Sequence, residues 1–123
     1  MLPITLRASL AVCALPLLAS VAMASFTPDR TKQIISQKGR RFGPSAVYVR
    51  IDEDLYIQND DDELVHDAYV DSPDFTFESG DINPGATAVI AFPKEGDFLI
   101  LCGVHPSMKL VVHVQSSTGQ QSR

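Results

Sequence analysis

Apolar and polar residues alternate with a period of two along much of the chain. Val47, Val49 and Ile51 share one face of such a pattern, and Leu110 and Val112 do the same further along. This alternation is typical of β-strands that are buried on one face. No stretch shows a comparable helical stripe. The pattern predicts seven strands, at residues 32–37, 46–51, 55–59, 65–70, 86–92, 97–101 and 109–114.

Turn-forming residues separate these strands, at Gly43-Pro44 and in the segments 52–54, 60–62, 83–85 and 93–96. Short strands at this spacing are typical of two packed sheets. We therefore expect an all-β fold of about seven or eight strands, a two-sheet antiparallel β-sandwich with Greek-key connections. The chain has 123 residues, which suffices for one such domain with one hydrophobic core.

The N-terminal segment 1–24 has the pattern of a secretory signal peptide. Arg7 precedes an apolar run at 8–18, and Ala24 completes a small-residue cleavage site. We expect cleavage after Ala24, which leaves a mature domain at 25–123, with its core at 32–115 and a polar C-terminal tail. The apolar run is too short to span a membrane, and lipid attachment at Cys13 fits the local sequence poorly. We therefore expect a soluble periplasmic protein rather than an anchored one.

Cleavage would also leave one cysteine without a disulfide partner. The chain has two cysteines, and removal of Cys13 leaves only Cys102. In an oxidising compartment a lone thiol is a liability unless something such as a metal occupies it. His105 and Met108 follow Cys102 closely, and His66 supplies a second imidazole upstream. Two histidines, one cysteine and a weak methionine are the ligand set of blue-copper electron-transfer sites, so these residues predict one copper ion that cycles between Cu(I) and Cu(II).

Each of these residues also has an ordinary structural interpretation. Cys102 would then be a small buried hydrophobic residue, and Met108 would fill space in the core. His66 would be a solvated turn residue. The short spacing of Cys102, His105 and Met108 favours the metal site over these alternatives. His113 alternates with an apolar strand face, so we expect it to point to solvent and to lie outside the site.

The segment 34–114 resembles the cupredoxins, and within them the plastocyanin and amicyanin group. Pro106, directly after a histidine in a C-x-x-H-x-x-M loop, is most similar to amicyanin. The resemblance implies a type 1 copper site in which His66, Cys102 and His105 form an approximately trigonal set and Met108 is a long axial ligand. It rests on features spread over the domain: Asn59 with the acidic turn before His66, Pro84-Gly85 at the start of a strand, the segment 92–98, and the loop from Cys102 to Met108.

One position departs from the family pattern. Asp67 follows the first predicted histidine ligand, where cupredoxins usually carry an asparagine that clamps the ligand loop and donates toward the cysteine sulfur. An ionised carboxylate cannot donate a hydrogen bond, and its charge favours oxidised copper. Alternatively, Asp67 is protonated, or it pairs with a backbone N–H and has no electronic role.

The charge of the chain bears on its partners. The formal net charge is −5, and it becomes more negative once Arg7 is removed, which argues against nucleic acid as a partner. The acidic run 60–63 beside His66 is a candidate for steering a basic redox partner, although it also fits a solvated turn. We expect a monomer that exchanges electrons with a redox partner such as a c-type cytochrome or a dehydrogenase.

Three classes of function are open to such a chain. The ligand set favours a blue-copper carrier of single electrons. Copper storage or delivery would use the same ligands but would need exchangeable metal. A copper enzyme, or a metal-free domain that acts in interactions, is the third class, because a fold does not determine a function. We expect no enzyme activity, since the sequence offers no obvious general base or substrate pocket.

Overall fold

The computed structural model describes residues 32–117. The predicted signal peptide and the last residues of the C-terminal tail lie outside this range. The described residues form nine strands: β1 (Gln33–Gln37), β2 (Phe42–Gly43), β3 (Ala46–Arg50), β4 (Asp54–Asn59), β5 (Tyr69–Asp71), β6 (Thr76–Glu78), β7 (Thr87–Ala91), β8 (Gly96–Leu101) and β9 (Lys109–Gln115). No helix occurs within 32–117, so none there is long and apolar enough to cross a membrane.

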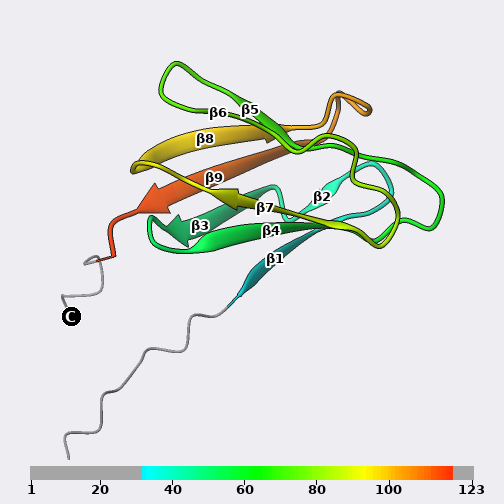
Figure 1. Cartoon of the computed structure of the whole chain (residues 1–123), viewed down its shortest axis with the longest axis horizontal. Helices are drawn as coiled ribbons and strands as arrows, with labels where there is room; N and C mark the ends of the chain where they lie inside the picture. The colour runs from blue at the N-terminus through cyan, green and yellow to red at the C-terminus, as the bar shows by residue number, and fades with distance from the viewer. Residues whose placement is uncertain (1–31, 118–123) are drawn as a thin grey trace, which may run out of the picture.

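The strands form two sheets that pack against each other (Figure 1). One sheet has four strands in the order β2-β1-β4-β7, and the other has five in the order β3-β9-β8-β5-β6. The predicted all-β, two-sheet sandwich is therefore confirmed. Six of the seven predicted strands match observed strands to within one residue at each end. The very short strands β2 and β6 had no clear periodic signal.

The expectation of purely antiparallel pairing is wrong, because both sheets are mixed. β1 runs parallel to β4, with Ile35 opposite Ile57, and β3 runs parallel to β9, with Val47 opposite Val112. Turn signals in a sequence report on strands that are joined directly, which pair as antiparallel hairpins. Each parallel pair instead joins strands that are distant in the sequence, and no local pattern marks such a pair.

The predicted strand at 65–70 is also wrong over most of its length, because only its last part belongs to β5. Side chains take up some of the backbone hydrogen bonds of the preceding residues. Gln37 Nε2 donates to the carbonyl of Asp67 at 2.8 Å, and the N–H of Ala68 donates to Ser79 Oγ at 2.8 Å. Together with the isolated backbone bridge between His66 and Ile82, these bonds replace the pairing with a continuous strand that the prediction assumed.

The alternating pattern produces the core between the sheets. Leu55 and Ile57 of β4 are fully buried, as are Ile100 of β8 and Leu110 of β9. Burial of one such side chain stabilises the fold by about 1.5–3 kcal/mol relative to exposure. The two sheets are thereby fixed against each other, and the connections at their ends start from rigid strands.

Two connections meet at one end of this sandwich. The β8–β9 loop, residues 102–108, is orange in Figure 1, and the long β4–β5 connection, residues 60–68, is green. All four predicted ligands are in these connections, with His66 in the β4–β5 connection and the others in the β8–β9 loop.

Candidate metal centre

Three of the predicted ligands converge at this end of the sandwich. Ligand atoms of His66, Cys102 and His105 all lie within 4.8 Å of one another. The Nδ1 atom of His66 is 4.0 Å from Cys102 Sγ and 3.1 Å from His105 Nδ1. A metal ion binds imidazole nitrogen at about 2.0 Å and thiolate sulfur at about 2.3 Å. An ion placed between these atoms would therefore bind all three with little adjustment of the protein.

The donor set and its burial fit copper. His66 is 0% exposed and Cys102 is 1% exposed, so water has little access to either. A thiolate with two imidazoles suits copper and zinc alike, and a nearby thioether favours copper. Met108, also 1% exposed, is in the same loop and packs in the core. Ligation by Met108 stays a prediction.

Strand alternation places the cysteine. Phe98, Ile100 and Cys102 are buried, while Leu99 between them is 41% exposed, so the inward face of β8 continues to the sulfur. The chain then turns, and the N–H of Met108 donates to the carbonyl of His105 at 2.9 Å. The loop thus places its three predicted ligands at the end of the sandwich before β9 begins.

His66 is placed by an isolated β-bridge to Ile82 rather than by a strand. The N–H of His66 donates to the Ile82 carbonyl at 3.2 Å, and the Ile82 N–H donates back at 2.6 Å. Asn59 ties this bridge to the end of β4, because its side-chain amide donates to the carbonyls of Leu64 and Ile82, both at 2.7 Å. Its Oδ1 also accepts the N–H of Asp61 at 2.9 Å. One buried asparagine therefore shapes the approach to the histidine.

Asp61 contacts the predicted ligand His66, and no sequence pattern predicted this contact. Its Oδ2 lies 2.7 Å from His66 Nε2, the nitrogen on the other side of the ring from the cluster. The backbone N–H of Gly39 donates to the same carboxylate. This bond, followed by the one to His66, holds the pKa of Asp61 below the usual value for a carboxyl. The spacing of Asp61 and His66 carried no recognisable signal, because their contact depends on the path of an irregular turn.

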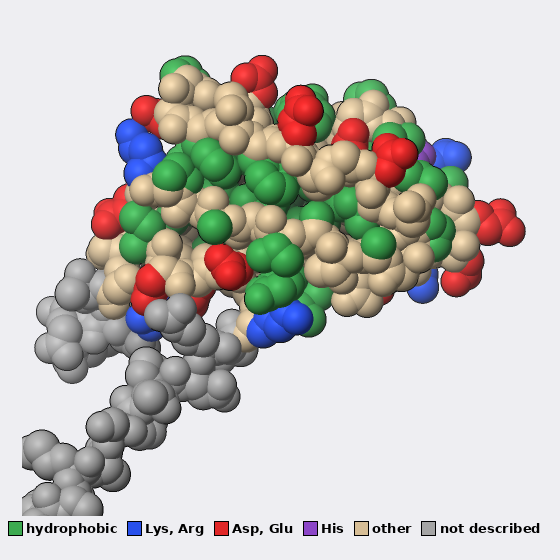
Figure 2. Space-filling view, in the orientation of Figure 1, with side chains coloured by type: hydrophobic (Ala, Val, Ile, Leu, Met, Phe, Trp, Pro, Cys, Tyr) green, Lys and Arg blue, Asp and Glu red, His purple; other side chains and the backbone are tan. Residues whose placement is uncertain are grey.

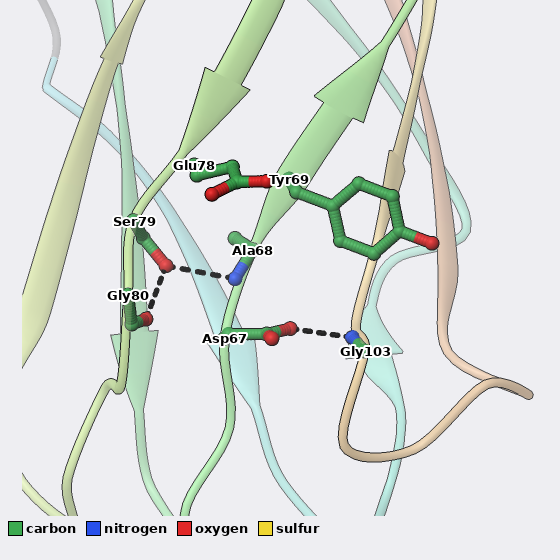
Figure 3. Close-up of a pocket in the computed structure, with 7 residues that line it drawn as sticks. All are labelled: Asp67, Ala68, Tyr69, Glu78, Ser79, Gly80 and Gly103. Carbon is green, nitrogen blue, oxygen red and sulfur yellow. Dashed lines mark hydrogen bonds between the residues drawn. The ribbon is translucent and has the colours of Figure 1, made fainter.

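Asp67 joins the two connections of the site. The N–H of Gly103 donates to its Oδ1 at 2.5 Å, as Figure 3 shows. Of the arrangements expected for Asp67, the structure therefore shows pairing with a backbone N–H. A Cβ at Gly103 would lie 2.9 Å from Asp67 Oδ2, so the close contact suits glycine. Both residues line a shallow pocket, together with Ala68, Tyr69, Glu78, Ser79 and Gly80.

The outer edge of the site is apolar. His105 is half-buried, and it is flanked by Val104, which is 48% exposed, and by the exposed Pro106. His113 lies elsewhere, on β9: its ring stacks on Tyr48 with centroids 4.6 Å apart, and its Nδ1 is 2.6 Å from an oxygen of Asp97. It is not among the clustered residues.

Solved structures with the same fold include copper proteins. A copper-containing nitrite reductase from Thermus scotoductus is 23% identical, over 69% of this chain, with a TM-score of 0.63; the match spans only 22% of the reductase. An oxidised amicyanin variant is 13% identical, over 75% of this chain and 89% of its own, with a TM-score of 0.64. A reduced amicyanin variant is 13% identical, over 73% and 87%, with a TM-score of 0.64.

No protein-family model matches the chain, and no curated protein matches it in sequence. At these low identities the structural similarity shows the fold alone. That fold is the cupredoxin β-sandwich, as the residues predicted, and the cluster of His66, Cys102 and His105 within it fits a type 1 copper site.

Proposed function

We propose that this protein is a periplasmic carrier of single electrons that holds one copper ion at His66, Cys102, His105 and Met108. The observation that carries the proposal is the convergence of two imidazole nitrogens and one thiol sulfur within 4.8 Å at the end of a rigid sandwich. Bound copper would supply a one-electron couple between Cu(I) and Cu(II). The predicted export signal at 1–24 supports the periplasmic location.

The protein's own residues would keep the site similar in both oxidation states. Cys102 continues the inward face of β8, and His66 is held by its bridge to Ile82. Neither ligand can move far without breaking core packing or backbone hydrogen bonds. A site that rearranges little on gain or loss of an electron exchanges electrons quickly. Rigidity of the ligands therefore favours a carrier.

His105 would be the point of electron exit. It is the one half-buried member of the cluster of His66, Cys102 and His105, and the exposed Val104 and Pro106 beside it form an apolar collar. An apolar surface around a redox centre allows a partner to approach closely. We propose a c-type cytochrome or a dehydrogenase as the partner, with this protein acting as a monomer.

Repeated redox cycling in the presence of a strong Cu(I) chelator separates a carrier from a copper-delivery protein. A carrier retains its copper through many cycles, because loss of Cu(I) would end turnover. The variant His105→Gly, which lacks the half-buried ligand, serves as the control in which the chelator should extract copper. Rapid loss of copper from the unmodified protein on the first reduction would favour delivery instead.

A further inference from the structure

Both nitrogens of the buried His66 ring have defined surroundings. Nδ1 faces the cluster, 4.0 Å from Cys102 Sγ and 3.1 Å from His105 Nδ1. Nε2 faces away from it and lies 2.7 Å from Asp61 Oδ2. Because the ring is fully buried, water does not compete for either nitrogen. The carboxylate is thus the partner of the nitrogen that the metal would not use.

The position of Asp61 is determined by groups other than the histidine. The N–H of Gly39 lies 3.0 Å from its Oδ1 and 3.2 Å from its Oδ2. The backbone N–H of Asp61 itself donates to Asn59 Oδ1 at 2.9 Å. The side chain is only 13% exposed. These contacts aim the carboxylate at His66 before any metal binds.

An ionised carboxylate can accept a hydrogen bond but cannot donate one, so its partner nitrogen must carry the hydrogen. Nε2 of His66 therefore carries the hydrogen, and the lone pair of Nδ1 points into the cluster. A carboxylate partner also makes an imidazole a more basic ligand, and such partners typically change metal affinity 10–100-fold when they are removed. More basic ligands and a nearby negative charge stabilise Cu(II) over Cu(I).

We propose that Asp61 is a positioning residue of the copper site: through His66 Nε2 it selects the tautomer that presents Nδ1 to the metal, and it lowers the reduction potential. This inference rests on the proposed copper site. The neighbouring Asp62 offers a matched control, since it is exposed and carries the same charge one residue away. If replacement of Asp61 shifts the reduction potential more than replacement of Asp62, the excess reports the hydrogen bond to His66 rather than charge alone.

The first test uses metal-free protein and so does not depend on copper. Nitrogen-15 NMR of the imidazole rings should show His66 with its hydrogen on Nε2 in the unmodified protein and in Asp62→Asn. In Asp61→Ala the hydrogen should be distributed over both nitrogens. A His66 hydrogen on Nδ1 in the unmodified protein would overturn the inference. This outcome is measured on the unmodified protein, so it does not depend on whether any variant folds.

The second test uses the copper-loaded protein. Asp61→Asn keeps an oxygen that can accept from Nε2 but removes the charge, so the potential measured by protein-film voltammetry should rise. We expect a change of about tenfold in the relative affinity for Cu(I) and Cu(II), equal to 59 mV for one electron, and a smaller rise in Asp62→Asn. Pulsed EPR of the Cu(II) form should show an altered coupling of one remote imidazole nitrogen in Asp61→Asn alone.

Equal shifts of potential in Asp61→Asn and Asp62→Asn, with unchanged remote-nitrogen coupling, would overturn the role of Asp61 while leaving the copper site intact. A protein that takes up no copper would instead contradict the proposed function. In that case the NMR measurement still decides whether Asp61 sets the tautomer of His66.

Discussion

Asp67 lies in the contact between the two connections that hold the predicted ligands. Its Oδ1 accepts the N–H of Gly103 at 2.5 Å, directly beside Cys102. The carboxylate therefore holds the two connections together. We predict a second role for the same side chain, in which its charge would favour Cu(II) at the neighbouring site.

Asp67→Asn should separate these two roles. The amide oxygen can still accept from Gly103, so the loop should stay attached, while loss of the charge destabilises Cu(II) relative to Cu(I). We expect the reduction potential to rise, on the order of the 59 mV that a tenfold change in relative affinity represents. Protein-film voltammetry provides the measurement, with the exposed Asp71 replaced by asparagine as the control. An unchanged potential would show that the carboxylate has no electronic role.

The sequence was informative about single residues where a periodic or motif pattern applied. The alternation in β8 correctly predicted that Cys102 faces inward, and the short C-x-x-H-x-x-M spacing correctly predicted that Cys102 and His105 come together. It did not reveal the contact between Asp61 and His66. That contact needs a turn of a particular path, and aspartates are common in turns because their side chains bond the local backbone.

At the scale of elements, the β4–β5 connection is held by few side chains. Asn59 is 0% exposed and spans the connection with hydrogen bonds to Leu64, Ile82 and Asp61. In a variant without the amide, the part-buried Leu64 carbonyl and the Asp61 N–H would lose this partner, and the buried Ile82 carbonyl would keep only its bond from the His66 N–H. An unsatisfied buried polar group costs about 1–3 kcal/mol.

Asn59→Ala should therefore lower the free energy of unfolding of the metal-free protein by about 2–4 kcal/mol. Urea unfolding followed by circular dichroism measures this change. The exposed Asn83 is the matched control, and Asn83→Ala should cost less than about 0.5 kcal/mol. Similar losses in both variants would contradict the role assigned to Asn59.

The elements also show where sequence patterns stop. Period-two alternation located the long strands, because burial on one face requires it. The parallel pairs β1–β4 and β3–β9 and the non-strand course of 65–68 depend on partners that are distant in sequence. Gln37, which supplies one of those partners, appeared in the sequence only as a polar residue at the end of a strand.

For the whole molecule, the structure divides the acidic run 60–63 into two parts. Asp60 is bound by Gln58 and Ser36, and Asp61 by His66. Asp62 and Glu63 remain exposed. In Figure 2, acidic side chains (red) occur over much of the visible face. Some project at the end that carries the β4–β5 and β8–β9 connections. The exposed pair is therefore the part of the run that a partner can contact most directly.

Replacement of both Asp62 and Glu63 by their amides should slow electron exchange with a cationic c-type cytochrome at low salt, by roughly 2–10-fold, and should weaken its salt dependence. Stopped-flow kinetics over a range of ionic strength measures both effects. The control replaces the exposed Asp54 and Glu95, which precede or begin strands at the other end of the sandwich. Equal slowing in both double variants would indicate net charge rather than local steering.

The most direct test of the central claim is the visible absorption spectrum of the purified protein after addition of Cu(II). Cys102 is the free cysteine of the described residues, and it lies against two imidazoles. We predict an intense blue or green colour from thiolate-to-copper charge transfer, and its loss in Cys102→Ser. A colourless Cu(II) protein, or a band that persists in Cys102→Ser, would contradict a type 1 copper site at these residues.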